Sequence, residues 1–418
     1  MQVEALRDHL AHEASLLRAR GPAEPNSDRY DRAVDTVARM RANFRRFGIT
    51  RLAQVTGLDR IGIPVWMAVR PNSRTLAVSQ GKGLSDPAAQ ASAIMEAAEI
   101  AIAERCTIPT RLATMQELAA EGARVLPLNN LIARGEKHIG ETEAVAWVEG
   151  YDLLMGGTAW VPAEAVTLDP RDPSGRISRY WQSSDGLASG NILLEAVLHG
   201  LCERVERDAG TLWLFRSDAE VFEHCVDPAS LEDEAVDGLV AQIDRTGFQL
   251  RLFDITSDIE VPVSFAVIAP KLDGFEKHWK HFDLSSGMGC HPSPARAAIR
   301  AITEAAQSRV TSITGARDDF DPNLYATQLK ADLADYLRAA PTARKVAGDD
   351  RPRDAMDSLE FILGRLRERS VSSVIAVPLE VSDGFAVAKV VVPELENPMG
   401  SRRQRFGRRA LMAMARAR

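Results

Sequence analysis

Cysteine and long apolar runs are both scarce in this chain of 418 residues, and each scarcity excludes a class of protein. The cysteines form no C-x-x-C pair and are scattered over four positions: Cys106, Cys202, Cys225 and Cys290. That usage argues against a zinc module and a disulfide framework, and it is typical of a reducing cytoplasm. The best apolar run, from Val261 to Ala269, is far too short to span a bilayer, which takes about 20 residues. The N-terminus has no apolar signal core, so we expect a cytoplasmic protein without a membrane span.

Positive charge is also short over most of the chain. The formal net charge is −7, although the last eighteen residues hold seven arginines and no acid. The body is therefore more acidic than the total, which disfavours nucleic-acid binding by the core. The hydrophobic content of 45% and the charged content of 26% are those of an ordinary soluble globular protein, and a chain of this length buries a large core.

The central motif runs from Ser183 to Asp208 and reads SSDGLASGNILLEAVLHGLCERVERD. A turn rich in glycine and serine is predicted to lead into about five turns of helix, with Asn191 as the N-cap. A polar stripe follows the helix at i, i+4, i+11 and i+15, formed by Asn191, Glu195, Cys202 and Glu206. Charged helical positions are most simply a solvated face. The sequence favours a site instead because two other stretches repeat this design.

The two repeats each combine a Ser-x-Gly turn with a helix that carries a polar pair three residues apart. SQGKG, which begins at Ser79, precedes a helix containing Glu96-Ala97-Ala98-Glu99, with Ser92 ahead of it. SSGMG, which begins at Ser285, precedes a helix containing Glu304-Ala305-Ala306-Gln307, with Arg300 at the place of Ser92. The central helix supplies a third pair in Glu203 and Glu206.

These acid pairs predict a bound cation. Residues three apart share a helix face, and like charges at that spacing repel each other unless something cationic compensates them. Magnesium is the economical choice because it takes hard oxygen ligands and is commonly shared with phosphates.

The rest of the chain indicates an α+β fold in which helices pack on mainly antiparallel sheets with approximate strand-turn-helix repeats. Residues 1–47 are predicted to form a helical arm that serves for packing or interaction. Strands are expected near 65–69, 74–78, 145–149, 157–162 and 277–284, and an Asp-Gly turn predicts a hairpin over 374–392. Further helices are expected over 231–246, 323–340 and 355–367.

Five motifs in order resemble the YcaO family: GIPV, SxGKG, SxxxExxE, SGNxxxEAxxxGLxExxERD and ExxQSR. The resemblance covers roughly residues 48–396. It implies a fold unlike the common nucleotide-binding folds, so the lack of a P-loop or a GxGxxG motif does not argue against ATP. It also implies that ATP and Mg²⁺ are used to phosphorylate a peptide backbone amide oxygen, which a nucleophile then replaces. The expected division is a helical arm (1–47), an ATP-binding catalytic domain (48–396) and an arginine-rich tail (397–418).

The resemblance also implies roles for the polar residues of the motifs. By this resemblance, four acids bind magnesium and its phosphates: Glu96, Glu99, Glu203 and Glu206. Six residues are implied to bind the nucleotide: Lys82, Ser92, Asn191, Glu195, Glu304 and Gln307. The implied catalytic residues are Glu206, Arg207 and Arg300, since an arginine near a transferring phosphate neutralises developing charge.

Simpler interpretations stay open for several of these residues. Arg207 also fits an exposed i, i+4 pair with Glu203, which contributes only about 0.5 kcal/mol or less. Lys82 equally fits a solvated turn. Packing or a polar helix face is the simplest interpretation for four further residues: Cys202, the neighbours Cys290 and His291, and His199. Their positions in the sequence do not indicate a catalytic role. This set therefore remains outside the expected catalytic group.

Differences from the family's sequence pattern favour one of its subtypes over the others. Residues 27–32 read SDRYDR in place of a Gly-Thr-His-Arg stretch, which puts a phosphate or substrate contact from the arm in doubt. The tail is not proline-rich, and a fused leader-peptide-binding domain is not expected. GLDRIGIPV and SQGKG are more similar to the TfuA-associated group, so we expect thioamide formation with a TfuA-type partner and, as in relatives, a homodimer acting on a substrate peptide. The alternatives are an azoline-forming cyclodehydratase and a non-catalytic accessory protein in ribosomal-protein methylthiolation, although a scaffold has no use for repelling carboxylates.

Overall fold

The computed structural model describes most of the chain: residues 3–21, 23–24, 27–169, 178–180, 182–271, 279–318, 321–329, 335–344, 346, 352–397 and 405–416. Within these residues the strands form three sheets, and every pairing between the named strands is antiparallel. Helices cover the sheets, so the α+β class predicted from the sequence is confirmed.

The three sheets are built from consecutive parts of the chain, with one late hairpin inserted. The first has the order β1 (Arg51–Gln54), β2 (Val65–Val69), β3 (Val78–Lys82). The second has the order β11 (Ser285–Cys290), β10 (Val263–Pro270), β9 (Phe248–Asp254), β8 (Cys225–Val226). The third has the order β4 (Arg111–Ala113), β5 (Val145–Asp152), β12 (Ile375–Ser382), β13 (Phe385–Val391), β7 (Leu187–Gly190), with β6 (Thr158–Pro162) paired to β5.

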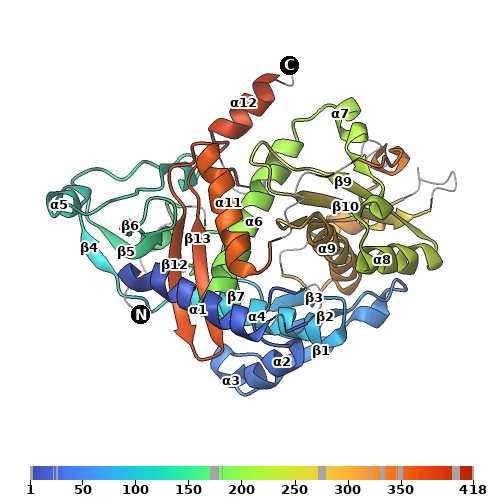
Figure 1. Cartoon of the computed structure of the whole chain (residues 1–418), viewed down its shortest axis with the longest axis horizontal. Helices are drawn as coiled ribbons and strands as arrows, with labels where there is room; N and C mark the ends of the chain where they lie inside the picture. The colour runs from blue at the N-terminus through green and yellow to red at the C-terminus, as the bar shows by residue number, and fades with distance from the viewer. Residues whose placement is uncertain are drawn as a thin grey trace.

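Each sheet ends in an edge strand that runs into a long helix. β3 leads to α4 (Asp86–Glu104), β7 to α6 (Leu193–Trp213) and β11 to α9 (Pro294–Thr314). The three units interlock in a cycle, because α4 contacts β7, α6 contacts β11 and α9 contacts β3. Figure 1 shows α6 at the centre, between the hairpin β12–β13 and the sheet of β9 and β10. This cycle brings the three motif-bearing helices to a common centre.

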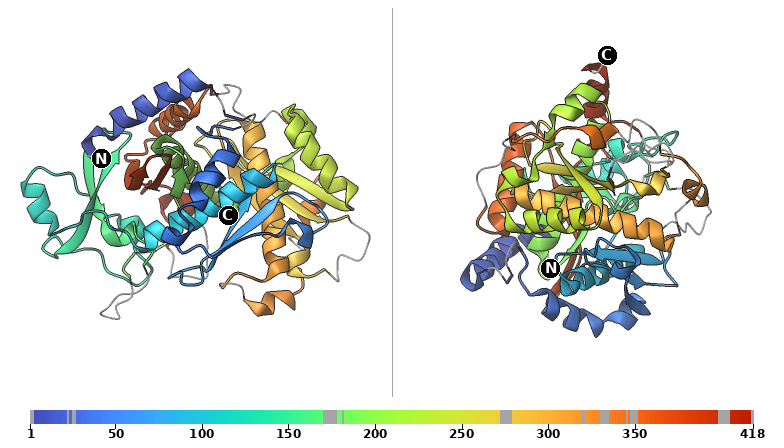
Figure 2. Two further views of the ribbon diagram at one scale, coloured as in Figure 1. Left: turned by 90° about the horizontal axis from the view of Figure 1, so that it is seen from below. Right: turned by 90° about the vertical axis from the view of Figure 1, so that its right-hand side faces the viewer.

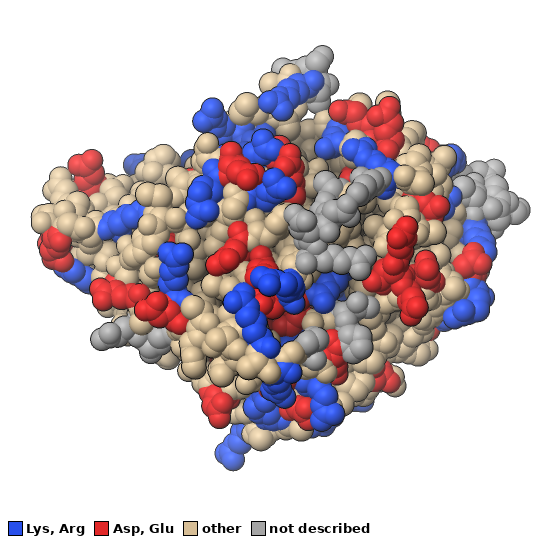
Figure 3. Space-filling model, in the orientation of Figure 1, with Lys and Arg blue, Asp and Glu red and all other residues tan. Residues whose placement is uncertain are grey.

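The remaining helices lie outside this centre, with α5 (Met115–Ala120) at one end of the molecule and α12 (Arg408–Arg416) projecting from it in Figure 1, and Figure 2 gives two further views. The bounds of the others are α1 (Leu6–Arg20), α2 (Ala33–Arg41), α3 (Phe44–Phe47), α7 (Asp218–Glu223), α8 (Glu234–Arg245) and α11 (Ala355–Glu368). α1 and α11 lie against α6, which is buried along most of its length. None of the described helices combines the length and the apolar character needed to cross a membrane. On the face in Figure 3, basic and acidic side chains of the described residues are interspersed.

The Ser-x-Gly sequences are strand segments, so their prediction as turns was wrong. Each glycine lies where the following helix crosses its own strand. A Cβ added to Gly81 would lie 2.0 Å from the backbone nitrogen of Ala93, and one added to Gly287 would lie 2.3 Å from that of Ala305. Only glycine permits this approach. A turn and a strand covered by a helix thus select the same residue, and the sequence pattern could not separate them.

The start of α6 also differs from its prediction. The helix begins at Leu193, and Asn191 does not cap it. Instead, the amides of Leu193 and Leu194 donate to the carboxylate of Glu13 on α1, at 3.0 and 2.7 Å. A carboxylate satisfies the free amides of a first helical turn and complements the helix dipole. The N-terminal arm, in which the sequence indicated little chemistry, therefore fixes the start of the central helix.

The secondary-structure predictions elsewhere were mixed. The hairpin is confirmed by the register of β12 and β13, with Gly384 at φ +71° in its turn. The helix expected over 355–367 matches α11. The strand expected over 74–78 starts only at its last residue and continues to Lys82. In the 277–284 region, residues 277–278 lie outside the described part of the chain, and residues 281–283 form the 3₁₀ helix η7. Of 323–340, residues 330–334 are likewise outside it, and the described residues on either side include the 3₁₀ helices η8 (Pro322–Tyr325) and η9 (Tyr336–Arg338).

The strand–helix contacts predict a sharp difference between glycines. Gly287→Ala places a methyl group inside the contact of β11 with α9, and we expect the free energy of unfolding to fall by about 2–3 kcal/mol. Gly238→Ala in α8 is the matched control, since a Cβ there meets nothing within 4 Å. It is expected to gain about 0.5–1 kcal/mol from helix propensity. Urea unfolding checks both, and equal stability of the two variants would contradict the packing described.

Candidate functional site

Carboxylates from the three central helices face a common space. Glu96 of α4 lies within electrostatic range of Glu203 on α6 and of Glu304 on α9. Glu206 of α6 likewise lies near Glu304. Positions of α6 that a solvated face would expose, such as Glu195 and Glu206, are buried. The acid stripe is therefore the wall of an internal site.

Two of these acids lack a close partner. Glu96 makes no hydrogen bond or ion pair with another described residue, and the nearest cation to Glu206 is the Nη1 atom of Arg207, 3.9 Å from its Oε1. Burial, reinforced by neighbouring carboxylates, raises the pKa of Glu96 and of Glu206 to about 7. A bound cation would stabilise the ionised form of each carboxyl and lower its pKa.

Arg207 is the main positive charge on the α6 wall. Its Nη2 atom donates to Glu203 at 3.3 Å, and its Nε atom lies 3.5 Å from Asp185. Glu203 also accepts from the amide of Gly186 at 2.9 Å. Burial still raises the pKa of Glu203, while Glu206 and Glu203 outweigh burial and raise that of Arg207. Arg207 serves several acids at once, so the simple i, i+4 pair is an incomplete description.

Lys82 joins the first repeat to the third. Its Nζ atom lies 2.6 Å from Oε2 of Glu304, and Nε2 of Gln307 donates to the carbonyl of Gln80 at 2.7 Å. Burial alone would raise the pKa of Glu304, but Lys82 and Arg207 outweigh it and hold that pKa below its usual value. The alternative of a solvated turn lysine is therefore wrong.

Asn191 and Glu195 form one end of the site together with the N-terminal arm. The amide of Asn191 donates to Glu195 at 3.0 Å, and its side-chain oxygen accepts from Thr36 and Arg39 at 2.8 Å each. Arg29 donates to Glu195 at 3.1 Å. The sequence of residues 27–32 had put in doubt any contact between this arm and the phosphate or substrate. The structure brings Arg29 and Arg39 to this end, where sequence reasoning had missed them.

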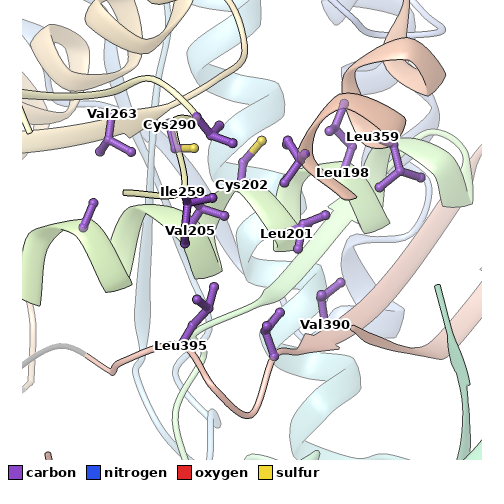
Figure 4. Close-up of a cluster of buried hydrophobic side chains, with 14 of the residues drawn as sticks. Leu198, Leu201, Cys202, Val205, Ile259, Val263, Cys290, Leu359, Val390 and Leu395 are labelled. Atoms are coloured by element: carbon purple, nitrogen blue, oxygen red, sulfur yellow. The ribbon is translucent and has the colours of Figure 1, made fainter. Parts of the chain in front are cut away.

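The neighbours Cys290 and His291 serve separate structures. Cys290 lies with Cys202 in the buried hydrophobic cluster of Figure 4. The Nε2 atom of His291 lies 2.8 Å from Asp28, which also pairs with Arg296 of α9. Burial alone would raise the pKa of Asp28, but its interactions with His291 and Arg296 outweigh burial and hold that pKa well below its usual value. Packing is confirmed for both cysteines, and His291 ties the arm to α9.

The remaining predicted residues lie around the same space. Ser189 donates to Glu99 at 2.9 Å, and burial followed by the charge of Glu96 raises the pKa of Glu99 well above its usual value. The side chains of Ser92 and Arg300 make no hydrogen bond with another described residue. Burial, then Arg300, lowers the pKa of His199 well below its usual range. His199 thus faces the site as a neutral side chain, consistent with a polar-face position.

The acids fit a hard divalent cation that shares its ligands with a second molecule. Among the described residues, no three carboxylate, imidazole or thiol groups already surround one point as a complete metal site. Glu96 and Glu206 nevertheless present oxygens without hydrogen-bond donors among the described residues, and their raised pKa values show that burial disfavours the ionised carboxylates. Magnesium commonly takes one or two carboxylates and completes its shell with phosphate oxygens and water. This donor set has that character.

Comparison with known proteins gives one family match and several relatives. A family model described as "YcaO cyclodehydratase, ATP-ad Mg2+-binding" matches residues 80–396. A protein of Rhizobium leguminosarum bv. trifolii, described as an uncharacterized protein in the tfuA 3′ region, is 41% identical in an alignment of length 399 that covers 92% of this chain and 93% of that protein. An uncharacterized protein of Methanothermobacter thermautotrophicus is 34% identical in an alignment of length 363 that covers 84% of this chain and 90% of that protein. The family description bears out ATP and Mg²⁺ as cofactors.

Solved structures share the fold. YcaO from Methanopyrus kandleri, bound with AMPPCP and Mg²⁺, aligns with a TM-score of 0.62 and 23% identity over 90% of this chain and 97% of that one. A heterocyclase in complex with substrate and cofactor gives a TM-score of 0.67 and 21% identity over 90% of this chain and 54% of that one. At these identities the likeness establishes the fold alone.

The raised pKa values predict how pH and Mg²⁺ affect stability. Glu96 and Glu206 are carboxyls whose folded-state pKa lies above the unfolded value, so ionising them costs stability. The contribution of these two groups is favourable at low pH and is lost as pH rises from about 4.5 to about 7. In EDTA, we expect Glu96→Gln to raise the melting temperature more at pH 8 than at pH 5.5. Addition of Mg²⁺ is expected to stabilise the wild type more at pH 8 than at pH 5.5; equal effects at both values would contradict the assignment.

Proposed function

Because the chain belongs to the YcaO family, as its motifs predicted, we propose that it uses ATP and Mg²⁺ to activate a backbone amide of a substrate peptide. The observation that carries this proposal is the set of carboxylates on three converging helices, in which Glu96 and Glu206 have no hydrogen-bond donor among the described residues and burial raises the pKa of each to about 7. A scaffold gains nothing from such a set, because each buried charge without a partner costs stability.

The proposed reaction overcomes the poor reactivity of an amide carbon. Nitrogen donates into the carbonyl, which is the resonance that keeps the peptide planar. In the proposed reaction the amide oxygen takes the terminal phosphoryl group of ATP and ADP leaves. A nucleophile then forms a bond to the amide carbon, and the C–O bond breaks to release phosphate. Bound Mg²⁺ supplies the positive charge that lets an acidic site accept a triphosphate.

We assign the residues by their position. Glu96, Glu99, Glu203 and Glu206 would hold Mg²⁺. Lys82, Ser92, Asn191, Glu195, Glu304 and Gln307 would line the nucleotide. Arg207 is held in place by Glu203 and Asp185, and Arg300 keeps its guanidinium free of hydrogen bonds with the described residues. Arg207 would bring a positioned positive charge to a transferring phosphoryl group, and Arg300 would bring one that is not already committed to a hydrogen bond.

Thioamide formation with a TfuA-type partner is the specific reaction we favour. Sulfide is then the nucleophile, and the peptide exchanges its amide oxygen for sulfur. The support is the relative described by its place in the tfuA 3′ region, which matches this chain over nearly its full length. The family model's own description favours the alternative, a cyclodehydratase whose nucleophile is a Cys, Ser or Thr of the peptide.

Removing one unpartnered acid tests the enzyme. Glu206→Gln keeps the side-chain shape and removes the charge, and we expect phosphate release from ATP to fall at least 100-fold in the presence of peptide, because magnesium loses a ligand. Glu232→Gln, at an exposed position outside the site, is the control. Unchanged turnover in Glu206→Gln would remove this residue from the mechanism. A wild-type protein that binds no ATP with Mg²⁺ would favour the accessory-protein alternative.

Mass spectrometry of the modified peptide separates the two reactions. Exchange of oxygen for sulfur is the expected result when sulfide and the partner protein are supplied. Loss of water without sulfur would instead identify azoline formation and would contradict the preference stated above.

A further inference from the structure

A cavity of about 200 Å³ lies beside the acid site, between β11, α9, η7 and η8. Four serines and two aromatic rings supply most of its wall: Ser285, Ser286, Ser308, Ser312, Phe282 and Tyr325. The rings of Phe282 and Tyr325 lie 5.6 Å apart at a tilt, and the Tyr325 hydroxyl donates to the carbonyl of Ser312 at 2.7 Å. The polar wall is thus fixed in place by contacts within the described residues.

Both main walls of this cavity continue into the surroundings of Glu304. Along α9, Ser308 follows Glu304 by one helical turn, a rise of about 6 Å. Along β11, Ser286 precedes Met288 by two residues, and the backbone amide of Met288 donates to Glu304. An extended chain also advances about 6–7 Å in two residues. A peptide with an amide at the acid site therefore reaches this cavity with a neighbouring residue.

The charge of the cavity indicates what it can hold. Among the residues that the structure describes, its lining contains no Asp, Glu, Lys or Arg, and the remaining two lining residues are His281 and Leu284. A triphosphate needs cations or many amide donors, which this wall does not offer. Serine hydroxyls both donate and accept hydrogen bonds, and aromatic rings contact apolar groups. The wall suits a neutral peptide segment.

We propose that this cavity binds an uncharged residue of the substrate peptide, next to the amide that is activated; the inference rests on the function proposed above. Its volume is below the roughly 300–1,000 Å³ of a complete small-molecule site, and it matches one residue. The acid site then acts on the backbone, and the cavity selects by side chain.

Filling the cavity tests this proposal. The full chain is immobilised and exposed to a random nine-residue peptide library with AMPPCP and Mg²⁺, and the retained peptides are identified by mass spectrometry. Wild type is expected to retain a subset enriched in one uncharged residue type at one position. Ser308→Phe fills the cavity and is expected to retain that subset at least 10-fold less. Ile313→Phe is the matched control, because it adds a ring at an exposed position of the same helix.

The outcomes are separated by two further measurements. A melting curve shows whether Ser308→Phe folds; if it does not, Tyr325→Ala, which removes one wall, replaces it with the same expectation. Binding of a fluorescent ATP analogue is followed for every variant and is expected to be unchanged. A wild-type protein that does not bind the nucleotide would contradict the proposed function, whereas its retention of peptides would still test the cavity. Equal retention by the filled variant, no enrichment by wild type, or a subset rich in charged residues would overturn the cavity assignment.

Discussion

The burial of carboxylates from three helices around one site, reinforced by their mutual repulsion, is the constraint on which this structure depends. Glu96, Glu206 and their neighbours are held close together by a hydrophobic packing that outweighs their electrostatic cost. Burial raises the pKa of both acids to about 7, which means that the fold keeps them in an environment they would otherwise avoid. A site of this kind is unfavourable when empty of cations and favourable when a cation and an anionic ligand arrive together.

The interlocked strand–helix units explain how the cost is sustained. Each acidic helix lies directly over the glycines of its own strand and contacts the edge strand of the next unit. Displacing one helix therefore disturbs all three sheets. The arm adds two further ties, with Glu13 at the start of α6 and Asp28 bound to His291. The acidic side chains cannot move apart unless the helices that carry them separate from the core. The unfavourable electrostatic energy therefore persists in the folded protein and favours binding of a cation.

The sequence predicted those features of the site that repeat locally. The paired acids are three residues apart on helices, and that spacing is visible without a structure, so Glu203 and Glu206 were identified as one wall. Arg29 and Arg39 were missed because their partners, Glu195 and Asn191, lie more than 150 residues away in sequence, and such contacts have no local pattern. Glu13 was missed for the same reason. The strand glycines were misassigned because their cause is a helix packed across them, which a local turn signal imitates.

Calorimetric titration of AMPPCP into the metal-free chain, with and without Mg²⁺, tests the central claim most directly. The carboxylate-walled site predicts saturable binding with Mg²⁺ and at least a 100-fold weaker affinity without it, because the acids then repel the triphosphate. Binding of the nucleotide with equal affinity in EDTA would show that the acids do not govern the site and would contradict the account.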